Sequence, residues 1–291
     1  MKNILITGAN GQLGNEMRVL SAENPEYAYF FTDVAELDIC NEQAILDFVK
    51  ANQITVIVNC AAYTAVDKAE ENVELCTKLN ADAVGYLAKA AEACGAAEAC
   101  GAEFIQISTD YVFDGTAHVP YKETDETCPN SVYGTTKLLG EQNALTFCSR
   151  SMVIRTAWLY STFGNNFVKT MIRFAKDRDM LGVIFDQVGT PTYARDLARV
   201  IFAAIRQGVI SGVYHFSNEG VCSWYDFAKA IHRLAGITDC KVKPLHTSEY
   251  PTKASRPHYS VLDKTKIKTT YSIEIPYWMD SLESCIAELE A

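Results

Sequence analysis

The chain is poor in the features that mark membrane, secreted and metal-binding proteins. None of its 291 residues belongs to an apolar stretch of the roughly 20 residues that a membrane-spanning helix needs. The apolar run near the N-terminus is too short for a secretion signal and leads directly into a glycine-rich turn. We therefore expect a soluble, cytoplasmic protein with no membrane association.

Paired cysteines and clustered histidines are lacking as well. Ten cysteines occur, but none forms a Cys-x-x-Cys pair, and none of the five histidines stands at ligand spacing from them. This distribution predicts free thiols in a reducing compartment and no metal site. The formal net charge is −10 and no basic tract occurs, which argues against a nucleic-acid partner.

What the chain does contain is a regular alternation of short apolar runs and helical patterns. The hydrophobic share of 48% is enough for a large core and for two lobes. Because the runs are apolar throughout, they predict an α/β protein with a Rossmann-type, doubly wound parallel sheet. We expect strands at 4–7, 27–32, 55–59, 104–108, 152–155 and 212–216, and helices at 12–22, 42–52, 68–94, 133–147 and 224–234, with a terminal helix that has Pro276 in its first turn.

The last third is richer in loops and predicts a second lobe. We assign residues 1–157, joined by about 171–209, to a dinucleotide-binding domain. Residues 158–170 and 210–291 are assigned to a smaller C-terminal substrate-binding lobe over the carboxyl edge of the sheet. A six-residue tandem repeat, 91–96 and 97–102, is interpreted as a surface extension without a function.

A glycine-rich turn follows the first expected strand. Gly8, Gly11 and Gly14 open the first helix, where glycine lets the backbone approach a pyrophosphate and the free helix amides attract that anion. The Gly-x-x-Gly-x-x-Gly spacing differs from the commoner one, but its strand-turn-helix context favours a dinucleotide site. We expect the same turn to include Asn10, Gln12 and Leu13.

An acidic residue ends the second expected strand. Asp33 could accept hydrogen bonds from ribose hydroxyls and would repel a 2′-phosphate, which favours NADH over NADPH; a turn without a ligand is the alternative. After the third strand, Ala61 and Ala62 leave room for a dinucleotide at the sheet edge, although plain helix–sheet packing explains small residues there equally well.

Tyr133 stands four residues before Lys137 at the start of an expected helix, so both side chains share one helix face. A neighbouring ammonium favours phenolate and should lower the tyrosine pKa, giving a group that exchanges a proton with a substrate oxygen. The pair is common by chance on solvated helices, and it gains weight here from the nucleotide-binding turn in the same chain.

Several longer motifs resemble the extended short-chain dehydrogenase/reductase superfamily and, within it, the dTDP-4-dehydrorhamnose reductases. The resemblance covers nearly the whole chain. It rests on the glycine turn 8–14 and on the segments 59–70 (NCAAYTAVDKAE), 108–115 (STDYVFDG), 133–137 (YGTTK), 155–160 (RTAWLY), 164–168 (GNNFV), 186–192 (DQVGTPT) and 255–257 (SRP).

The resemblance implies reduction of the C4 ketone of dTDP-4-dehydro-β-L-rhamnose by NADH or NADPH, giving dTDP-L-rhamnose. It implies Thr109, Tyr133 and Lys137 as catalytic residues, with Ser108 as the rival of Thr109. It also implies that Asp38, Ile39 and Tyr63 help to bind the cofactor. The implied substrate contacts are Thr64, Thr109, Asp110, Tyr111, Trp158, Asn165 and Arg256, although Trp158 is almost as readily a core aromatic and Arg256 a solvated surface residue.

Other interpretations stay open. The fold also resembles the regulatory β subunit of methionine adenosyltransferase, a dinucleotide-binding partner protein, but such a module does not need a poised phenol. A related epimerase or dehydratase is a third possibility, and a dehydratase would need an additional acid pair beside the tyrosine. Some reductases of this type are reported to dimerise around Mg²⁺ through a glutamate matching Glu16, but Arg195 replaces the second expected carboxylate, so we expect no such bridge and either a monomer or a homodimer.

Overall fold

The protein is described here from a computed structural model that covers residues 2–94 and 101–290. Residues 95–100 of the tandem repeat at 91–102, which include Cys100, lie outside the described residues. Within the described part of the chain, no helix is both long and apolar enough to cross a membrane.

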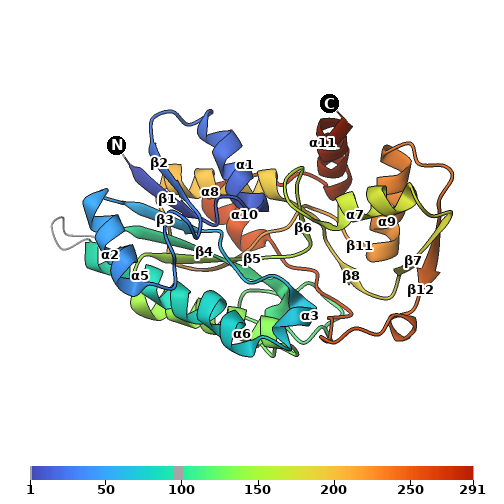
Figure 1. Ribbon diagram of the computed structural model, residues 1–291, viewed down its shortest axis with the longest axis horizontal. Coiled ribbons are helices and arrows are strands. Elements are labelled where there is room, and N and C mark those ends of the chain that lie inside the picture. Colours follow the sequence, from blue (N-terminus) through green and yellow to red (C-terminus); the bar gives the residue numbers. More distant parts are fainter. Residues whose placement is uncertain (1, 95–100, 291) are drawn as a thin grey trace.

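A six-stranded parallel sheet forms the centre of the larger lobe (Figure 1). Its spatial order is β2 (Ala28–Thr32), β1 (Asn3–Thr7), β3 (Val56–Asn59), β4 (Glu103–Thr109), β5 (Ser151–Thr156) and β10 (Gly212–His215). The order reverses at β1, because β2 lies on one side of β1 and β3 on the other. Such a reversal leaves a crevice beyond the carboxyl ends of the strands, where ligands of open α/β sheets bind. The predicted fold class and all six predicted strands are confirmed.

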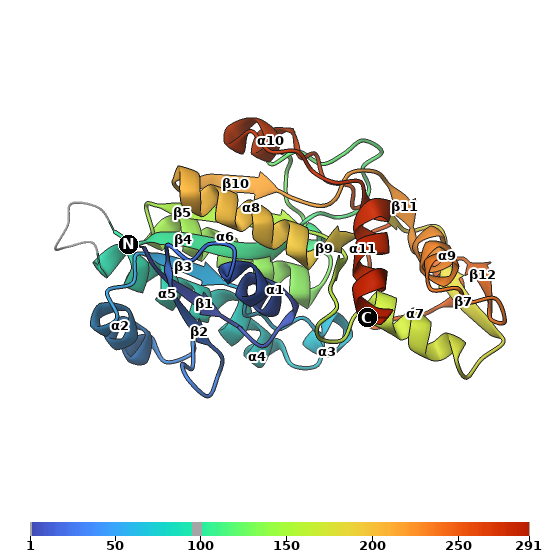
Figure 2. The ribbon, with the colours of Figure 1, turned by 90° about the horizontal axis from the view of Figure 1, so that it is seen from above.

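Helices cover both faces of this sheet (Figures 1 and 2). The strands alternate accordingly, since Ile4 and Ile6 pack on one face and Leu5 on the other. One face carries α1 (Gln12–Ser21), α8 (Ala194–Gln207) and α10 (Thr265–Tyr271). The opposite face carries α2 (Glu42–Ala51), α5 (Ala83–Ala93) and α6 (Val132–Phe147).

Polar caps fix where several helices begin. The side chain of Asn41 accepts the Ala44 amide at the start of α2, and Ser131 accepts the Gly134 amide at the start of α6. Ser223 and Asp226 form a capping box at α9 (Trp224–Leu234). These local signals set the start of α6, and with it the positions of the residues on its first turns.

Residues 68–94 do not form the single helix that the sequence predicts. The chain makes α3 (Val66–Ala69), α4 (Val73–Thr77), a π-helical turn η1 (Lys78–Asp82) and then α5. On that turn, the Asn80 side chain accepts the Tyr63 amide at 2.8 Å and donates to the Tyr63 carbonyl at 3.1 Å. A Cβ on Gly140 of α6 would lie 2.1 Å from the Asn80 carbonyl oxygen. These contacts override the local helical pattern.

The smaller lobe lies at one end of the sheet (Figure 2). It is built on a parallel pair of strands, β7 (Met180–Ile184) and β12 (Lys241–Leu245), with helices α7 (Phe167–Ala175), α9 and α11 (Trp278–Glu290). Its core includes Phe227, Ile231 and Leu282. Short elements complete the chain: β6 (Leu159–Tyr160), β8 (Val188–Gly189), β9 (Thr192–Tyr193), β11 (Cys222–Ser223), and the 3-10 turns η3 (Asp110–Val112) and η4 (Thr247–Glu249).

Three segments belong to the other lobe from the one that the sequence predicts. Residues 212–215 form β10, which extends the central sheet beside β5, and Ile267 of α10 packs into the core of the larger lobe. Conversely, Met171 and Leu181 belong to the core of the smaller lobe. An apolar pattern predicts that a segment is buried but does not specify which sheet it joins. Pro276 also differs, since it precedes α11 by two residues instead of lying in its first turn.

Candidate functional site

The glycine turn between β1 and α1 is built for close backbone approach. Gly8 has φ +62°, and a Cβ there would lie 2.6 Å from the Ala61 amide nitrogen. A Cβ on Gly14 would lie 2.4 Å from the Gly8 carbonyl oxygen, so this glycine lets α1 approach β1. Helix α1 begins after Gly11 without a side-chain cap, which leaves its first amides free for an anion.

A cavity of about 350 Å³ opens beside this turn, at the point where the strand order reverses. Seven predicted cofactor residues line it: Gly8, Gly11, Asp33, Asp38, Ile39, Ala61 and Ala62. Sequence reasoning missed four further lining residues, Val34, Leu37, Cys60 and Leu79. The first three adjoin predicted positions and could have been found by extending those segments, but Leu79 comes from η1 and no local signal marked it.

Asp33 stands at the rim of this cavity, at the end of β2. Its Oδ2 accepts the Asn10 amide at 3.1 Å and its Oδ1 accepts the Val34 amide at 2.9 Å. These two bonds turn the carboxylate towards the glycine turn. The side chain is only partly buried, so both oxygens keep lone pairs for a ligand.

Apart from Tyr133 and Lys137, five other predicted cofactor residues lie outside the cavity lining, among them Asn10, whose amide donates to Asp33. The Leu13 side chain is buried in the core of the larger lobe, and Gly14 serves the packing of α1 on β1. Gln12 accepts a hydrogen bond from Asn166 of the smaller lobe. Tyr63 is held through its backbone by Asn80. The contacts described for these residues are therefore structural ones.

The three predicted catalytic residues converge at the carboxyl end of β4. Thr109 is the last residue of β4, and Tyr133 and Lys137 lie one turn apart on α6. The Lys137 Nζ donates to the Ile107 carbonyl of β4 at 2.5 Å. Gly134 permits this approach, because a Cβ there would lie 2.2 Å from the Tyr111 carbonyl oxygen.

Burial has the largest effect on the pKa values of Tyr133 and Lys137. Desolvation raises the pKa of Tyr133, and the neighbouring Thr109 hydroxyl lowers it in part. Desolvation also lowers the pKa of Lys137 to about 8, against the carboxylate of Glu141, which raises it. The predicted lowering of the Tyr133 pKa by Lys137 is thus wrong for this structure, since the cost of burying a phenolate dominates and Lys137 is not among the groups that shift the Tyr133 pKa.

Hydrogen bonding gives Ser108 and Thr109 different environments. Ser108 Oγ donates to Glu141 Oε1 at 2.5 Å in a fully buried position. The Thr109 hydroxyl instead donates to Asp110 Oδ1 at 3.0 Å and lies beside the Tyr133 phenol. Thr109 is therefore the hydroxyl that shares a location with Tyr133.

Asp110 has an unusual carboxyl group. It is 2% exposed, and its Oδ2 is buried without a hydrogen-bond partner. Burial raises its pKa to about 6, and the hydroxyls of Ser260 and Thr109 offset only part of this effect. A buried acceptor without a partner, next to the catalytic residues, suits a group that a substrate hydroxyl would satisfy.

Replacing Asp110 by asparagine should stabilise the fold at neutral pH. A carboxyl whose pKa is higher in the folded than in the unfolded state binds more protons when folded, so stability falls as pH rises from about 4 to about 6. Asparagine has no such loss. We expect the gain in unfolding free energy to be about 2 kcal/mol larger at pH 7 than at pH 4, as measured by urea denaturation.

Asp114→Asn supplies the control of opposite sign for this experiment. Hydrogen bonds from Thr116 lower the pKa of Asp114, so its contribution is present at neutral pH and is lost in acid. An Asp110→Asn gain that is equal at pH 4 and pH 7 would contradict the buried-charge explanation.

Tyr111 and Trp158, two of the predicted substrate contacts, each pack against another aromatic ring. Tyr111 meets the Tyr133 ring edge-to-face, with centroids 5.5 Å apart. Trp158 has φ +48°, a conformation that costs energy outside glycine and is typical of functional sites. Its indole stacks on Trp224 at 3.6 Å between ring centroids, an α9 partner that the sequence did not indicate.

Three predicted substrate residues have a different environment from the one expected. Arg256 already forms a two-pronged ion pair with Asp67, at 2.7 and 3.1 Å, so its guanidinium fork is occupied. Asn165 and Thr64 are exposed. Beside Asn165, it is Asn166 that caps α7 and joins Gln12, because only its side chain points into the structure.

Glu16 and Arg195, the pair considered for a bridging metal, form an ion pair within the chain. Glu16 is fully buried, accepts Arg195 Nε at 2.8 Å and accepts the Ser161 hydroxyl at 2.6 Å. The second nitrogen of Arg195 pairs with Glu288 of α11. The two carboxylates therefore face a guanidinium.

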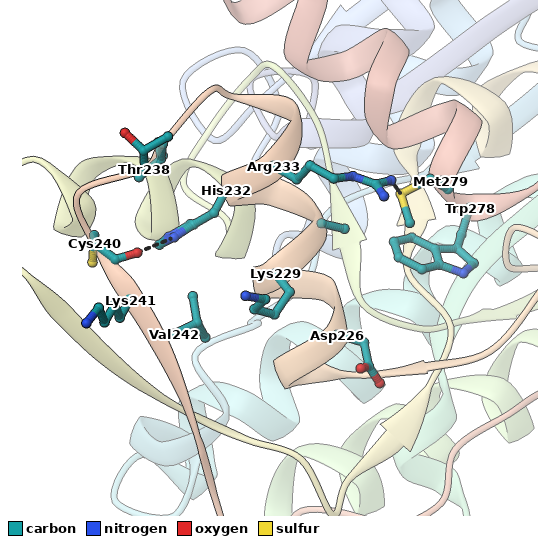
Figure 3. A pocket seen from close by; sticks show the side chains of 12 residues that line it. Asp226, Lys229, His232, Arg233, Thr238, Cys240, Lys241, Val242, Trp278 and Met279 are labelled. Atoms are coloured by element: carbon teal, nitrogen blue, oxygen red, sulfur yellow. Dashed lines mark hydrogen bonds between the residues drawn. The ribbon is translucent and has the colours of Figure 1, made fainter.

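Two further cavities lie in the smaller lobe. One, of about 350 Å³, is lined by Trp224, Arg178, Tyr250 and Arg256 among others, and it adjoins the Trp158 stack. The other, of about 740 Å³, lies between α9, β12 and the start of α11 (Figure 3). There His232 points to the Cys240 carbonyl and Arg233 to the Met279 sulfur, and none of the predicted site residues lines it.

The comparisons with known proteins agree with this geometry. Residues 1–291 match the family described as the RmlD substrate binding domain. The chain belongs to this family. It is 41% identical over 300 residues to dTDP-4-dehydrorhamnose reductase from Aggregatibacter actinomycetemcomitans, with 100% of each chain covered. The resemblance inferred from the motifs is confirmed.

Solved structures of other RmlD family proteins have the same fold. A dTDP-4-dehydrorhamnose reductase from Clostridium acetobutylicum has a TM-score of 0.93 and 47% identity, covering 99% of this chain and 100% of its own. The enzyme from Bacillus anthracis, solved with NADP, has a TM-score of 0.92 and 38% identity over the same shares. The family of this chain therefore binds nicotinamide dinucleotides on this fold and comprises oxidoreductases.

Proposed function

We propose that this protein reduces the C4 ketone of dTDP-4-dehydro-β-L-rhamnose to dTDP-L-rhamnose with a reduced nicotinamide dinucleotide. The observation that carries the proposal is the meeting of Thr109, Tyr133 and Lys137 at the carboxyl end of β4, on the same edge of the sheet as the glycine-lined cavity. Family membership over the whole chain supports the choice of substrate.

Tyr133, Thr109 and Lys137 have separate roles in this reaction. When bound, the reduced nicotinamide supplies the hydride that the ketone carbon accepts. Tyr133 gives its phenolic proton to the oxygen, and Thr109 donates a hydrogen bond to the same oxygen as negative charge develops there. Each such preorganised donor stabilises the transition state by about 3 kcal/mol. Lys137, held against β4 by Ile107, holds the nicotinamide ribose and balances the charge on the phenolate that remains.

The cavity next to the Trp158 stack suits the nucleotide end of the substrate. Trp224 and Tyr250 offer flat apolar surfaces to a pyrimidine, and Arg178 and Arg256 bring positive charge for a diphosphate. For Arg256 to bind phosphate, it must exchange its bonds to Asp67. Asp110, with its unpartnered oxygen, serves the sugar.

The proposal is tested by mixing the purified protein with NADH and the 4-keto sugar nucleotide while following the absorbance of the reduced cofactor. Oxidation of NADH that depends on the keto sugar, with dTDP-L-rhamnose as product, is expected. Tight binding of NADH without turnover would instead favour a regulatory dinucleotide-binding protein.

We predict that Asp33→Ala relaxes the preference for NADH. Loss of the carboxylate removes both the ribose acceptor and the charge that repels a 2′-phosphate, so the ratio of kcat/KM for NADH over NADPH should fall about tenfold. Steady-state kinetics with each cofactor measure this ratio. Asp47→Ala, an equal loss of charge on the exposed face of α2, should leave it unaltered. An unchanged ratio in Asp33→Ala would remove Asp33 from cofactor selection.

A further inference from the structure

A buried glutamate links the elements that carry the catalytic residues. Glu141 lies on α6, one turn beyond Lys137, and is 2% exposed. It accepts the Ser108 hydroxyl at 2.5 Å and both Nε and a terminal nitrogen of Arg155, at 2.9 and 2.7 Å. One carboxylate thus joins α6 to β4 and β5.

The hydrogen bonds of Glu141 reach the carboxyl end of β4, where the substrate oxygen would be held. Ser108 precedes Thr109 on β4, and in the sheet Ser108 pairs with Arg155 while Thr109 pairs with Thr156. Because Glu141 holds both members of the first pair, it fixes the end of β4 against α6. The separation between the Thr109 hydroxyl and the Tyr133 phenol follows from that distance.

Among the charged groups that shift the pKa of Lys137, the same carboxylate has the largest effect and raises that pKa, ahead of the Cys76 thiol of α4. The positive charge of Arg155 is matched by Glu141 and faces the Phe113 ring at 5.1 Å. His215 of β10 stays neutral beside Arg155, since burial lowers its pKa to about 3. Asp110 faces the Tyr133 phenol, while Glu123 accepts the His215 amide and Asp263 acts on the His215 ring.

We propose that Glu141 is a positioning residue for the reduction, which fixes Thr109 against Tyr133 through Ser108 and keeps Lys137 protonated. The proposal rests on the proposed function, because it assigns Glu141 a part in that same reaction. Arg155 completes the unit by forming a buried ion pair with this carboxylate, at 2.7 Å.

The chain provides a matched control of the same construction. Glu16 is also fully buried and also accepts one serine hydroxyl, from Ser161, and one guanidinium, from Arg195. It lies on α1 and contacts none of the three catalytic residues through the hydrogen bonds described above. Glu16→Gln therefore reproduces the structural loss of Glu141→Gln without touching Lys137.

The decisive experiment compares the pH dependence of kcat in Glu141→Gln and Glu16→Gln. Loss of the carboxylate removes the group that favours the lysine ammonium and leaves Arg155 as an extra positive charge. Both changes make Lys137 lose its proton more easily. We expect the alkaline limb of the kcat profile to move about one pH unit lower in Glu141→Gln and to keep its position in Glu16→Gln. A folded Glu141→Gln variant with the wild-type profile and kcat would overturn the proposal.

Ser108→Ala tests whether the hydrogen bond between Ser108 and Glu141 positions Thr109. It also tests the proposal if the Glu141→Gln variant does not fold. It breaks the link to β4 but keeps both charges. We expect kcat to fall about tenfold, with unchanged KM for NADH and an unmoved alkaline limb. Wild-type kcat in Ser108→Ala would remove the positioning role. If the wild-type protein itself shows no turnover, the proposed function fails instead, and the two failures are thereby distinguished.

Discussion

Replacing Tyr133 by phenylalanine should lower kcat about a thousandfold while leaving the affinity for NADH nearly unchanged. The substitution removes one hydroxyl from the carboxyl edge of the sheet and leaves the ring, which packs edge-to-face on Tyr111, in place. The ketone oxygen then loses its proton donor and keeps only the Thr109 hydroxyl. The glycine-lined cavity is not touched, so cofactor binding should persist.

Single-turnover absorbance measurements and fluorescence titration with NADH separate the two effects. Tyr86→Phe, the same change on the surface of α5, serves as the control and should keep wild-type kcat. A Tyr133→Phe variant that turns over at the wild-type rate would mean that another group protonates the oxygen.

Gly14→Ala should cost both stability and cofactor binding. A Cβ at this position would lie 2.4 Å from the Gly8 carbonyl oxygen and 2.5 Å from the Ala9 Cα, and both are backbone atoms that cannot rotate away. Helix α1 would have to move away from β1, at a cost of about 1–3 kcal/mol in unfolding free energy. Because the free amides of α1 would move with it, the affinity for NADH should fall at least about tenfold.

The control for this prediction is Gly85→Ala on α5. There a Cβ would meet only side-chain atoms at 3.5 Å or more, an ordinary contact, so alanine should stabilise the helix slightly. Thermal unfolding and NADH titration of the two variants give the comparison. Equal behaviour of Gly14→Ala and Gly85→Ala would show that α1 tolerates displacement from β1.

Much of the fold could be predicted because its signals are local. Each central strand is a short apolar run between polar residues, and Asn41, Ser131 and Ser223 mark helix starts through their own hydrogen bonds. The single helix predicted over 68–94 was wrong, because the break at η1 is stabilised by contacts with Tyr63 and with α6, which lie outside this segment. The predicted lobe boundaries differ from the structure for the same reason, because β10 joins the central sheet by pairing with β5, which is distant in sequence.

In the candidate site too, some features follow from local sequence and others from contacts between distant segments. The glycine turn and Asp33 follow two consecutive strands, at the spacing typical of a dinucleotide-binding unit, and the structure brings both to one cavity. In contrast, the ion pair of Arg256 with Asp67 joins residues that are far apart in the chain. The stacking of Trp224 on Trp158 could not be inferred from either segment alone.

The sequence by itself determined the parallel α/β fold, the nucleotide-binding turn and the residues able to transfer a proton, because these depend on periodicity, on glycine and on the chemistry of individual side chains. Only the tertiary structure decided that Thr109 and not Ser108 faces Tyr133, and that burial raises the pKa of that phenol. Desolvation and long-range hydrogen bonds arise when distant segments pack together, and no short stretch of sequence carries that information.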